Sequence, residues 1–322
     1  MKSTLVTLLI LLGSAYGIHL MGGLHTAPES AKAALGRKLF SEKILSADSS
    51  VSCASCHKPE FAFADTAAFS LGIHQTYTKR NTPSVLNMAN RPYFFWDGNA
   101  ATLEAQALMP IENPDEMGLP IEEAVHRLNQ SPSYVSLFKS VFRSKPNKQN
   151  LAAAFAAFER TLETVDSKFD DWSNDEARLS ASEERGRQLF IGSKAACFDC
   201  HFMEDFTDDA FRSIGLFDGA KLNDSGRFLI SRNPEDIGRF KTPGLRNVAL
   251  TAPYMHNGMF STLEEVVDYY DDPLKVLPGA KFIDSLMPRR IGLTVQEKKD
   301  LIAFLHTLTD RKYLPANAKA KP

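Results

Sequence analysis

Hydrophobic residues recur at three- and four-residue intervals along much of this chain, the spacing that places them on one face of an α-helix. The pattern predicts longer helices over Glu29–Phe40, Ile121–Leu128, Asn150–Glu163, Ser182–Phe190, Thr262–Tyr270 and Gln296–Leu308. The runs Ser182–Arg185 and Thr294–Glu297 resemble capped helix starts. Strand patterns are few and short, so the sequence predicts a mainly α protein.

An internal repeat organises most of the chain. Gly36–Phe40 (GRKLF) matches Gly186–Phe190 (GRQLF), and Thr82–Ala89 (TPSVLNMA) matches Thr242–Ala249 (TPGLRNVA). Each Thr-Pro pair is followed by a Thr-Leu-Glu triplet after 20 residues. We therefore interpret the chain as a duplicated module. The Asp- and Asn-rich stretch Asp166–Asp175 is expected to link two domains, 26–168 and 169–315.

Composition and charge bound the class of protein. The chain has 322 residues, of which 43% are hydrophobic and 24% are charged, as expected for a soluble globular protein with two cores. A formal net charge of -2 gives no general attraction to nucleic acid. We therefore expect no nucleic-acid partner.

The N-terminus has the pattern of a secretory signal. Lys2 precedes the apolar run Leu5–Leu12, and Ala15, Tyr16 and Gly17 offer small residues near a cleavage site. The run is too short to span a bilayer comfortably, and an uncleaved anchor is the alternative. We expect a signal peptide over residues 1–17 and export to the periplasm.

The four cysteines form two motifs of the type Cys-x-x-Cys-His. They comprise Cys53, Cys56 and His57 in the first half, and Cys197, Cys200 and His201 in the second. This spacing lets two thiols bond to the vinyl groups of one haem while the histidine reaches its iron. A disulfide and a zinc site are alternatives, but zinc would require both pairs to fold together and would not explain the histidines. The sequence predicts two covalently bound c-type haems.

The two halves differ at one position that bears on the haem irons. Eight residues after the matching Thr102 and Thr262 stand Pro110 and Tyr270. Proline cannot ligate iron, whereas a tyrosine phenolate can. The first haem would then have an open face and the second would be closed at both faces. Alternative ligands or packed residues near Tyr270 are Tyr269, Met255, Met259 and Met287.

Three further residues are candidates for chemistry at the open face. Glu116 could move a proton between the two oxygens of a peroxide, and Gln106 could orient that peroxide. Trp96 could carry electrons. From residue types alone, Glu116 could equally be a solvated loop acid, Gln106 a helix-surface residue and Trp96 a core residue.

The ordered set of motifs resembles the bacterial di-haem cytochrome c peroxidases, a family that also contains the MauG-type enzymes. The resemblance covers about residues 30 to 312. It rests on the two haem motifs and on Arg80–Asn87, Phe95–Gly98, Gln106–Met117, Leu245–Val248 and Thr251–Gly258.

The resemblance implies a role for individual residues. The haem held by Cys53, Cys56 and His57 would react with peroxide, with Gln106, Pro110 and Glu116 over it and Trp96 relaying electrons. The second haem, with His201 below its iron, would receive electrons from a small cytochrome or another periplasmic donor. A calcium ion would lie between the haems, bound by Asn81 and the backbone carbonyls of Thr251 and Pro253. A homodimer is compatible with the family.

Two departures from the common peroxidase pattern affect the expected function. Tyr270 stands where a methionine is usual, which resembles MauG and predicts a low potential for the second haem. Many relatives have a histidine that closes the resting peroxidatic haem. In this sequence Ile73 occupies the position of that histidine, and His74 is the next residue. A one-residue shift would restore that histidine, and a surface position for His74 is the alternative.

Three functions follow from these patterns. The first is a peroxidase that reduces hydrogen peroxide to water with electrons from a small cytochrome. The second is a MauG-like enzyme that uses peroxide to oxidise aromatic residues of a partner protein. The third is a plain electron-transfer cytochrome, which the open face predicted at Pro110 disfavours.

Overall fold

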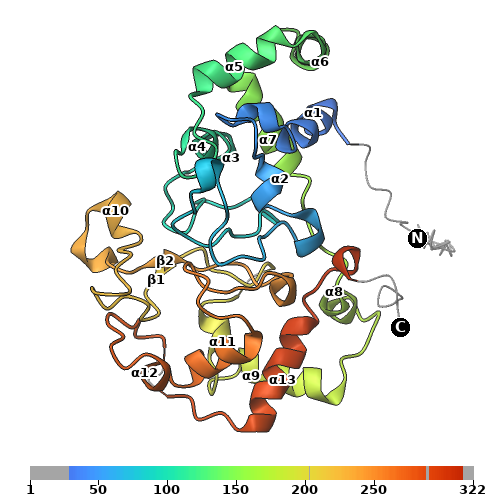
Figure 1. Ribbon diagram of the computed structural model, residues 1–322. Coiled ribbons are helices and arrows are strands. Elements are labelled where there is room, and N and C mark those ends of the chain that lie inside the picture. The colour runs from blue at the N-terminus through green and yellow to red at the C-terminus, as the bar shows by residue number, and fades with distance from the viewer. Residues whose placement is uncertain (1–28, 203, 288–289, 315–322) are drawn as a thin grey trace, which may run out of the picture.

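A computed structural model describes residues 29–314 of the protein apart from 203 and 288–289, and the described chain is mainly helical (Figure 1). The α-helices are α1 (Ala31–Phe40), α2 (Cys53–Cys56), α3 (Leu103–Gln106), α4 (Met109–Glu112), α5 (Ile121–Gln130), α6 (Pro132–Phe142), α7 (Lys148–Glu159), α8 (Lys168–Ser173), α9 (Ala181–Ile191), α10 (Phe228–Ser231), α11 (Leu263–Asp271), α12 (Pro273–Val276) and α13 (Val295–His306). Short 3-10 turns occupy Lys43–Leu45, Pro59–Phe61, Ile73–Gln75, Cys197–Asp199, Pro234–Asp236, Val248–Leu250 and Arg311–Tyr313. Strands β1 (Phe211–Arg212) and β2 (Phe240–Lys241) pair antiparallel, with Phe211 opposite Lys241.

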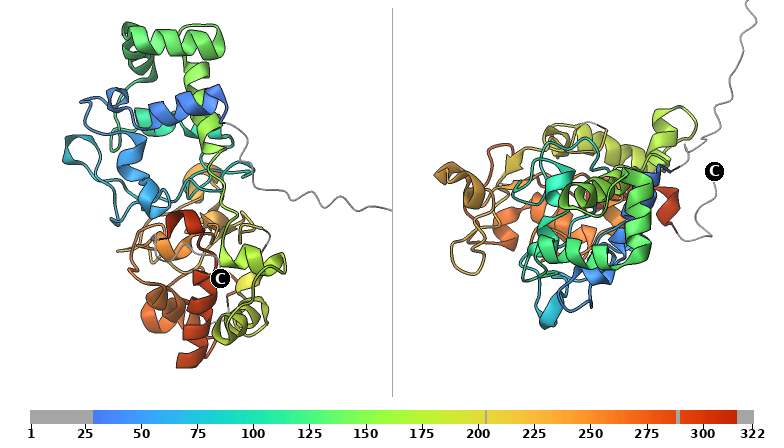
Figure 2. Two further views of the ribbon diagram at one scale, coloured as in Figure 1. Left: turned by 90° about the vertical axis from the view of Figure 1, so that its right-hand side faces the viewer. Right: turned by 90° about the horizontal axis from the view of Figure 1, so that it is seen from above.

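The elements gather into two lobes that follow the chain order. Helices α1 to α7 form the upper lobe in Figure 1, and α8 to α13 with the small sheet form the lower one. Figure 2 shows the same separation after a quarter turn. Each lobe has its own cluster of buried hydrophobic residues, with Phe155 and Phe158 in the upper cluster and Phe190 and Phe304 in the lower one.

The first and last long helices of each lobe cross at a glycine. A Cβ atom added to Gly36 of α1 would lie 1.9 Å from the carbonyl oxygen of Ala154 in α7. A Cβ added to Gly186 of α9 would lie 1.9 Å from the carbonyl oxygen of Asp300 in α13. Since no other residue lacks a Cβ, only glycine permits these crossings. The repeated Gly-Arg-x-Leu-Phe motif therefore produces the same helix contact twice.

An aromatic triplet surrounds each crossing. The triplets are Phe40, Phe63 and Phe158 in the upper lobe, and Phe190, Phe206 and Phe304 in the lower lobe. The ring centroids of Phe40 and Phe158 are 5.2 Å apart, and those of Phe190 and Phe304 are also 5.2 Å apart. Such tilted and edge-to-face contacts are favourable arrangements for aromatic rings.

All six longer helices predicted from the sequence are present, with shifted ends. Helix α7 ends at Glu159 rather than Glu163. The cap of α9 is Ser180 and not Ser182, because Ser180 and Glu183 form a reciprocal capping box, whereas Ser182 lies inside the helix. The Thr294 cap of α13 is confirmed, with Glu297 as its partner. Helix α6 was not predicted.

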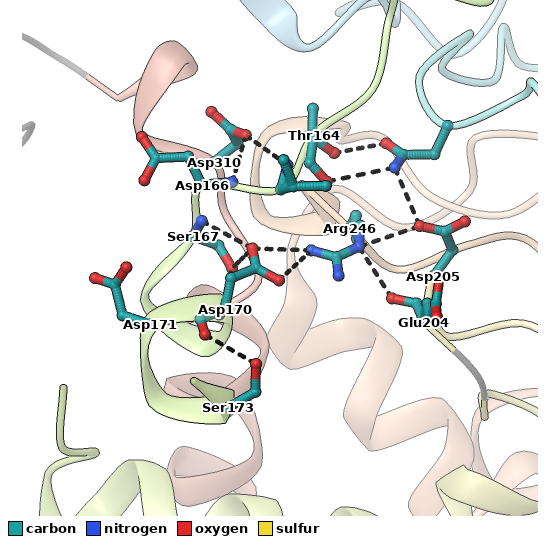
Figure 3. A network of polar contacts seen from close by, with 12 residues as sticks. Thr164, Asp166, Ser167, Asp170, Asp171, Ser173, Glu204, Asp205, Arg246 and Asp310 are labelled. Atoms are coloured by element: carbon teal, nitrogen blue, oxygen red, sulfur yellow. Dashed lines mark hydrogen bonds and ion pairs between the residues drawn. The ribbon is translucent and has the colours of Figure 1, made fainter. Parts of the chain in front are cut away.

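The expected linker, Asp166–Asp175, contains a helix. Ser167 and Asp170 form a capping box that starts α8, so the stretch is not an open loop. Arg246 then holds α8 in place, with Nη1 3.0 Å from Asp170 Oδ1 and Nε donating to Asp205 Oδ1 at 3.1 Å (Figure 3). Asn87 of the upper lobe donates to the same Asp205 oxygen at 3.1 Å. This polar network ties the linker to both lobes.

The signal peptide predicted for residues 1–17 lies outside the described residues. Within the described part of the chain, no helix combines the length and the apolar character needed to cross a membrane.

Candidate functional site

The first Cys-x-x-Cys-His motif forms the single turn of α2. Ser52 and Ser55 cap this turn, and the backbone N–H of His57 donates to the Cys53 carbonyl at 2.9 Å, which closes it. The Nδ1 atom of His57 lies 3.1 Å from the Phe63 carbonyl oxygen. A proton donated there leaves Nε2 as the ligating nitrogen. Burial lowers the pKa of His57, which favours the neutral imidazole that binds metals.

The second motif repeats this arrangement in the lower lobe. The backbone N–H of His201 donates to the Cys197 carbonyl at 2.9 Å, and His201 Nδ1 lies 2.9 Å from the Phe206 carbonyl oxygen. Burial also lowers the pKa of His201. Phe63 and Phe206 belong to the two aromatic triplets, so the packing of each core orients one histidine. These carbonyl partners were not predicted, because no side chain identifies them.

The alternatives to haem attachment do not fit the geometry. None of the four cysteines is paired in a disulfide in the structure. Burial raises the pKa of Cys56 to about 11 and that of Cys197 to about 12, which favours the protonated thiols. No cluster of three or more His, Cys, Asp or Glu residues able to hold a metal ion occurs in the described part of the chain. The two pairs therefore do not form a zinc site, whereas each pair with its histidine fits a c-type haem.

A cavity of about 310 Å³ lies beside the second motif and extends between the lobes. Cys197, Cys200, His201 and Tyr270 all line it. Tyr270 is half-buried, and burial raises the pKa of its phenol. A phenolate there would therefore need a cation such as iron to stabilise it.

The neighbouring tyrosine is engaged elsewhere. Tyr269 has no exposed surface, and its hydroxyl donates to the Ile214 carbonyl at 2.5 Å. Of the methionine alternatives, Met255 and Met287 line the cavity, and both Met255 and Met259 pack against the small hydrophobic cluster that contains Tyr269. Tyr270 is thus the tyrosine of the pair that faces the cavity.

The corresponding segment of the upper lobe is broken by Pro110. Thr102 and Thr262 both cap helices, but α11 runs unbroken from Leu263 to Asp271, whereas α3 ends at Gln106 and α4 begins at Met109. Pro110 has no backbone N–H with which to continue the helix of Gln106. The two lobes therefore differ at this position, since Tyr270 lines the cavity beside the second motif and Pro110 interrupts the helix at the matching place in the upper lobe.

Glu116 lies close to the first haem motif. Burial raises the pKa of Cys53 and of Cys56, and the charge of Glu116 contributes to both shifts to a smaller extent. Asn113 Nδ2 donates to Glu116 Oε1 at 2.6 Å. Burial raises the pKa of Glu116 to about 7, with Asn113 opposing the shift. A carboxyl with this pKa can both accept and donate a proton near neutral pH.

His74 lies at the protein surface. Its side chain is exposed, and its φ is 53°. A hydrogen bond from the Ser50 side chain lowers the pKa of Asp48, and a backbone hydrogen bond from His74 adds to this shift. Ile73 is 3% exposed and packs against Gly118. The segment thus turns an apolar side chain inward and the imidazole outward.

Trp96 lies where the two lobes meet. Its Nε1 donates to the Asn81 carbonyl at 2.8 Å, and its own carbonyl accepts from the Lys241 N–H at 2.7 Å. The rings of Trp96 and His256 meet edge to face, with centroids 6.5 Å apart. His256 was not predicted as part of the site, although the repeat places it 160 residues after Trp96, the spacing between Thr102 and Thr262.

His256 is held by its neighbours in a neutral state. Its ring stacks on Phe240 with centroids 3.7 Å apart, and its carbonyl accepts from the Asn81 N–H at 2.7 Å. Burial lowers the pKa of His256 to about 4. The stacked rings of Phe240 and His256 therefore lie at the junction of the lobes, and the neutral imidazole brings no charge to it.

The three residues expected to bind calcium line the same cavity as Trp96. They are Asn81, Thr251 and Pro253. Asn81 Nδ2 donates to the carbonyls of Ala67 at 3.2 Å and Ala68 at 3.3 Å. This orientation directs Asn81 Oδ1 away from these two carbonyls. An amide oxygen with backbone carbonyls is a donor set suited to calcium.

Comparisons with known proteins agree with this arrangement. The profile of the family described as "Di-haem cytochrome c peroxidase" matches residues 30–178. The methylamine utilization protein MauG of Methylorubrum extorquens is 41% identical over 282 residues, which cover 86% of this chain and 78% of that protein. The cytochrome-c peroxidase IdrP1 of Denitromonas iodatirespirans is 36% identical over 315 residues, covering 86% of this chain and 81% of the relative.

Solved structures share the fold. A MauG-like protein associated with microbial copper homeostasis superposes with a TM-score of 0.82 at 35% identity, covering 91% of this chain and 93% of its own. The diheme peroxidase BthA of Burkholderia thailandensis gives a TM-score of 0.79 at 27% identity, covering 92% and 90%. With this fold, the two motifs and these relatives, the chain belongs to the di-haem cytochrome c peroxidase and MauG family.

Proposed function

We propose that this protein is a di-haem c-type peroxidase that reduces hydrogen peroxide to water. Family membership makes it an oxidoreductase. The proposed enzyme consists of two cytochrome c-like domains related by duplication, a peroxidatic domain over 26–168 and an electron-entry domain over 169–315. The repeated glycine crossings and aromatic triplets support this division.

The observation that carries the proposal is the difference between the two lobes. Tyr270 lines the cavity that contains His201, whereas Pro110 takes the corresponding place in the upper lobe and His74 is exposed. We assign Tyr270 and His201 as the residues that would hold the iron of the second haem, and His57 as the residue that would hold the iron of the first. A haem iron with one open face supplies a place where peroxide can bind and be cleaved. Proton transfer, orientation of the peroxide and electron relay are assigned to side chains of the protein.

Glu116 is assigned the proton transfer. Its carboxylate would accept the proton of one peroxide oxygen and then donate it to the other oxygen, which leaves as water. The pKa of about 7 allows both steps near neutral pH. Gln106 is the last residue of α3, in the segment of the chain that leads to Pro110 and Glu116. We assign to Gln106 the role of orienting the peroxide.

Trp96 is assigned the relay of electrons between the domains. Its hydrogen bonds to Asn81 and Lys241 fix the ring at the lobe junction, in contact with the cavity of the second haem. Calcium bound by Asn81, Thr251 and Pro253 would hold this junction together. The electron donor is proposed to be a small cytochrome or a similar periplasmic protein, which agrees with an export signal over residues 1–17. A homodimer is compatible with the family.

A second function is favoured by Tyr270. MauG proteins are among the relatives, and the phenol in the cavity resembles the MauG pattern. A phenolate ligand stabilises oxidised iron and makes the second haem a poor electron acceptor. The alternative enzyme would use peroxide to oxidise aromatic residues of a partner protein.

Peroxide turnover separates the two functions. The holoenzyme is mixed with hydrogen peroxide and a reduced small cytochrome, and oxidation of the cytochrome is followed by absorbance. Sustained, peroxide-dependent oxidation supports the peroxidase, and Trp96→Phe should slow it. Consumption of peroxide without oxidation of any of several cytochromes would favour the MauG-like enzyme, and no consumption of peroxide would contradict both.

A further inference from the structure

A buried carboxyl in the upper lobe has no place in the proposed proton transfer. Glu159 is the last residue of α7 and is only 5% exposed. Its carboxyl makes no hydrogen bond or ion pair with any described residue. Burial of an unpaired carboxylate is costly, so such a group is retained neutral or has a partner that comes with a ligand.

The repeat indicates which way Glu159 faces. Gly36 meets Ala154 and Phe158 at the α1 crossing, just as Gly186 meets Asp300 and Phe304. The residue after Phe158 is Glu159, and the residue after Phe304 is Leu305. Leu305 lines the cavity that contains Cys197 and His201. By this correspondence, Glu159 occupies the matching position on the wall of the first haem site.

A second observation gives the same location. The pKa of Cys53 is raised first by burial and next by the charge of Glu159. The carboxyl is therefore close enough to act electrostatically on the first residue of the haem motif. A haem bonded to Cys53 would lie within the same range.

The surroundings of Glu159 leave its carboxyl free to titrate. The charged groups that act on it are Arg160, which lowers its pKa, and Glu104, which raises it. These two pair with each other at 2.8 Å at the surface, so their effects largely offset. Burial dominates and raises the pKa of Glu159 to about 8.

We propose that Glu159 is a proton-binding site coupled to the redox state of the first haem. This inference rests on the proposed function in requiring a haem at Cys53, Cys56 and His57. Oxidised iron adds one positive charge to the site, which stabilises the carboxylate form of Glu159. When an external donor supplies one electron, that charge is lost and the carboxylate takes up one proton from solvent. The net charge of the buried site is then the same before and after reduction.

The coupling can be measured without turnover. The midpoint potential of the first haem is determined in the holoenzyme by spectroelectrochemical titration at several pH values on either side of the Glu159 pKa of about 8. Because reduction takes up a proton, the potential should fall as the pH rises. In Glu159→Gln and in Glu159→Leu, which introduces the residue of the other lobe, this slope should be lost. The slope of the second haem should not change.

Two outcomes would overturn the proposal. The first is a parent enzyme whose first haem shows no slope, or whose slope survives in both Glu159 variants. The second is loss of the slope in Glu116→Gln but not in Glu159→Gln, since the charge of Glu116 also acts on the cysteines of this motif. Proton uptake by the parent on reduction in weakly buffered solution gives an independent reading. Since neither measurement uses peroxide, failure here is distinct from failure of the peroxidase function.

Discussion

Replacement of Glu116 by glutamine tests the assigned proton transfer directly. Glutamine keeps the size of the side chain and removes the exchangeable proton. The amide can still contact Asn113, which now donates to Glu116 Oε1 at 2.6 Å, so the local loop should persist. The expected change is therefore in the chemistry of the site and not in its fold.

The magnitude follows from the role and from the environment of the carboxyl. Loss of a general acid–base group typically slows a reaction by at least ~10²-fold, which is about 2.7 kcal/mol of barrier. The parent rate should also depend on pH. Glu116 must be ionised to accept the first proton, so the rate should fall as the pH drops below its pKa of about 7 and level off above it. Glu116→Gln should be slow and should lack this dependence.

Stopped-flow mixing of the oxidised holoenzyme with hydrogen peroxide measures this rate. Glu112→Gln is the matched control, because Glu112 is an exposed acid on the neighbouring helix α4. A Glu116→Gln rate within about twofold of the parent, well short of the general acid–base range, would refute the reasoning. Glu116 would then be an ordinary half-buried acid.

Three other predictions follow from the geometry. Denatured protein should retain both haems and have the mass of the chain plus two haem groups, because the two thiols of each motif bond covalently to the vinyl groups of one haem; haem that passes into acidified organic solvent would contradict attachment. Removal of calcium by a chelator should slow electron transfer between the haems and lower the melting temperature, since Asn81, Thr251 and Pro253 lie at the lobe junction; unchanged melting and transfer after verified removal would count against this site. Gly186→Ala should destabilise the protein by about 3 kcal/mol, as a Cβ there would lie 1.9 Å from the Asp300 carbonyl oxygen, whereas Gly279→Ala, with the nearest atom at 4.0 Å, should melt like the parent.

The sequence was sufficient where covalent chemistry or backbone geometry restricts the residue type. The Cys-x-x-Cys-His motifs predicted two haem sites, and in the structure each histidine has the same contact with a backbone carbonyl. The Gly-Arg-x-Leu-Phe repeat predicted matching modules, and its glycines lie at matching helix crossings. These residues cannot be exchanged for others, so their pattern is readable in one sequence.

The sequence was insufficient where two neighbouring residues compete for one position. Tyr269 and Tyr270 differ by about 100° around a helix, and only the packing of α11 decides which one faces the cavity. The positions of Ile73 and His74 depend on a turn in which His74 and Gln75 both have positive φ, which no residue type there predicts. Glu159 was read as part of a helix pattern, and its burial became evident only from the packing of α7 against α1.

The central claim is that one haem is open and the other is closed by Tyr270. The measurement that tests it most directly is the electron paramagnetic resonance spectrum of the fully oxidised holoenzyme, recorded with and without hydrogen peroxide. We predict one high-spin and one low-spin haem, a reaction with peroxide that needs no prior reduction, and a higher potential of the second haem in Tyr270→Met. His74→Ala should leave the spectrum unchanged, because His74 is exposed. A wholly low-spin enzyme that is inert until one electron is added would contradict the claim.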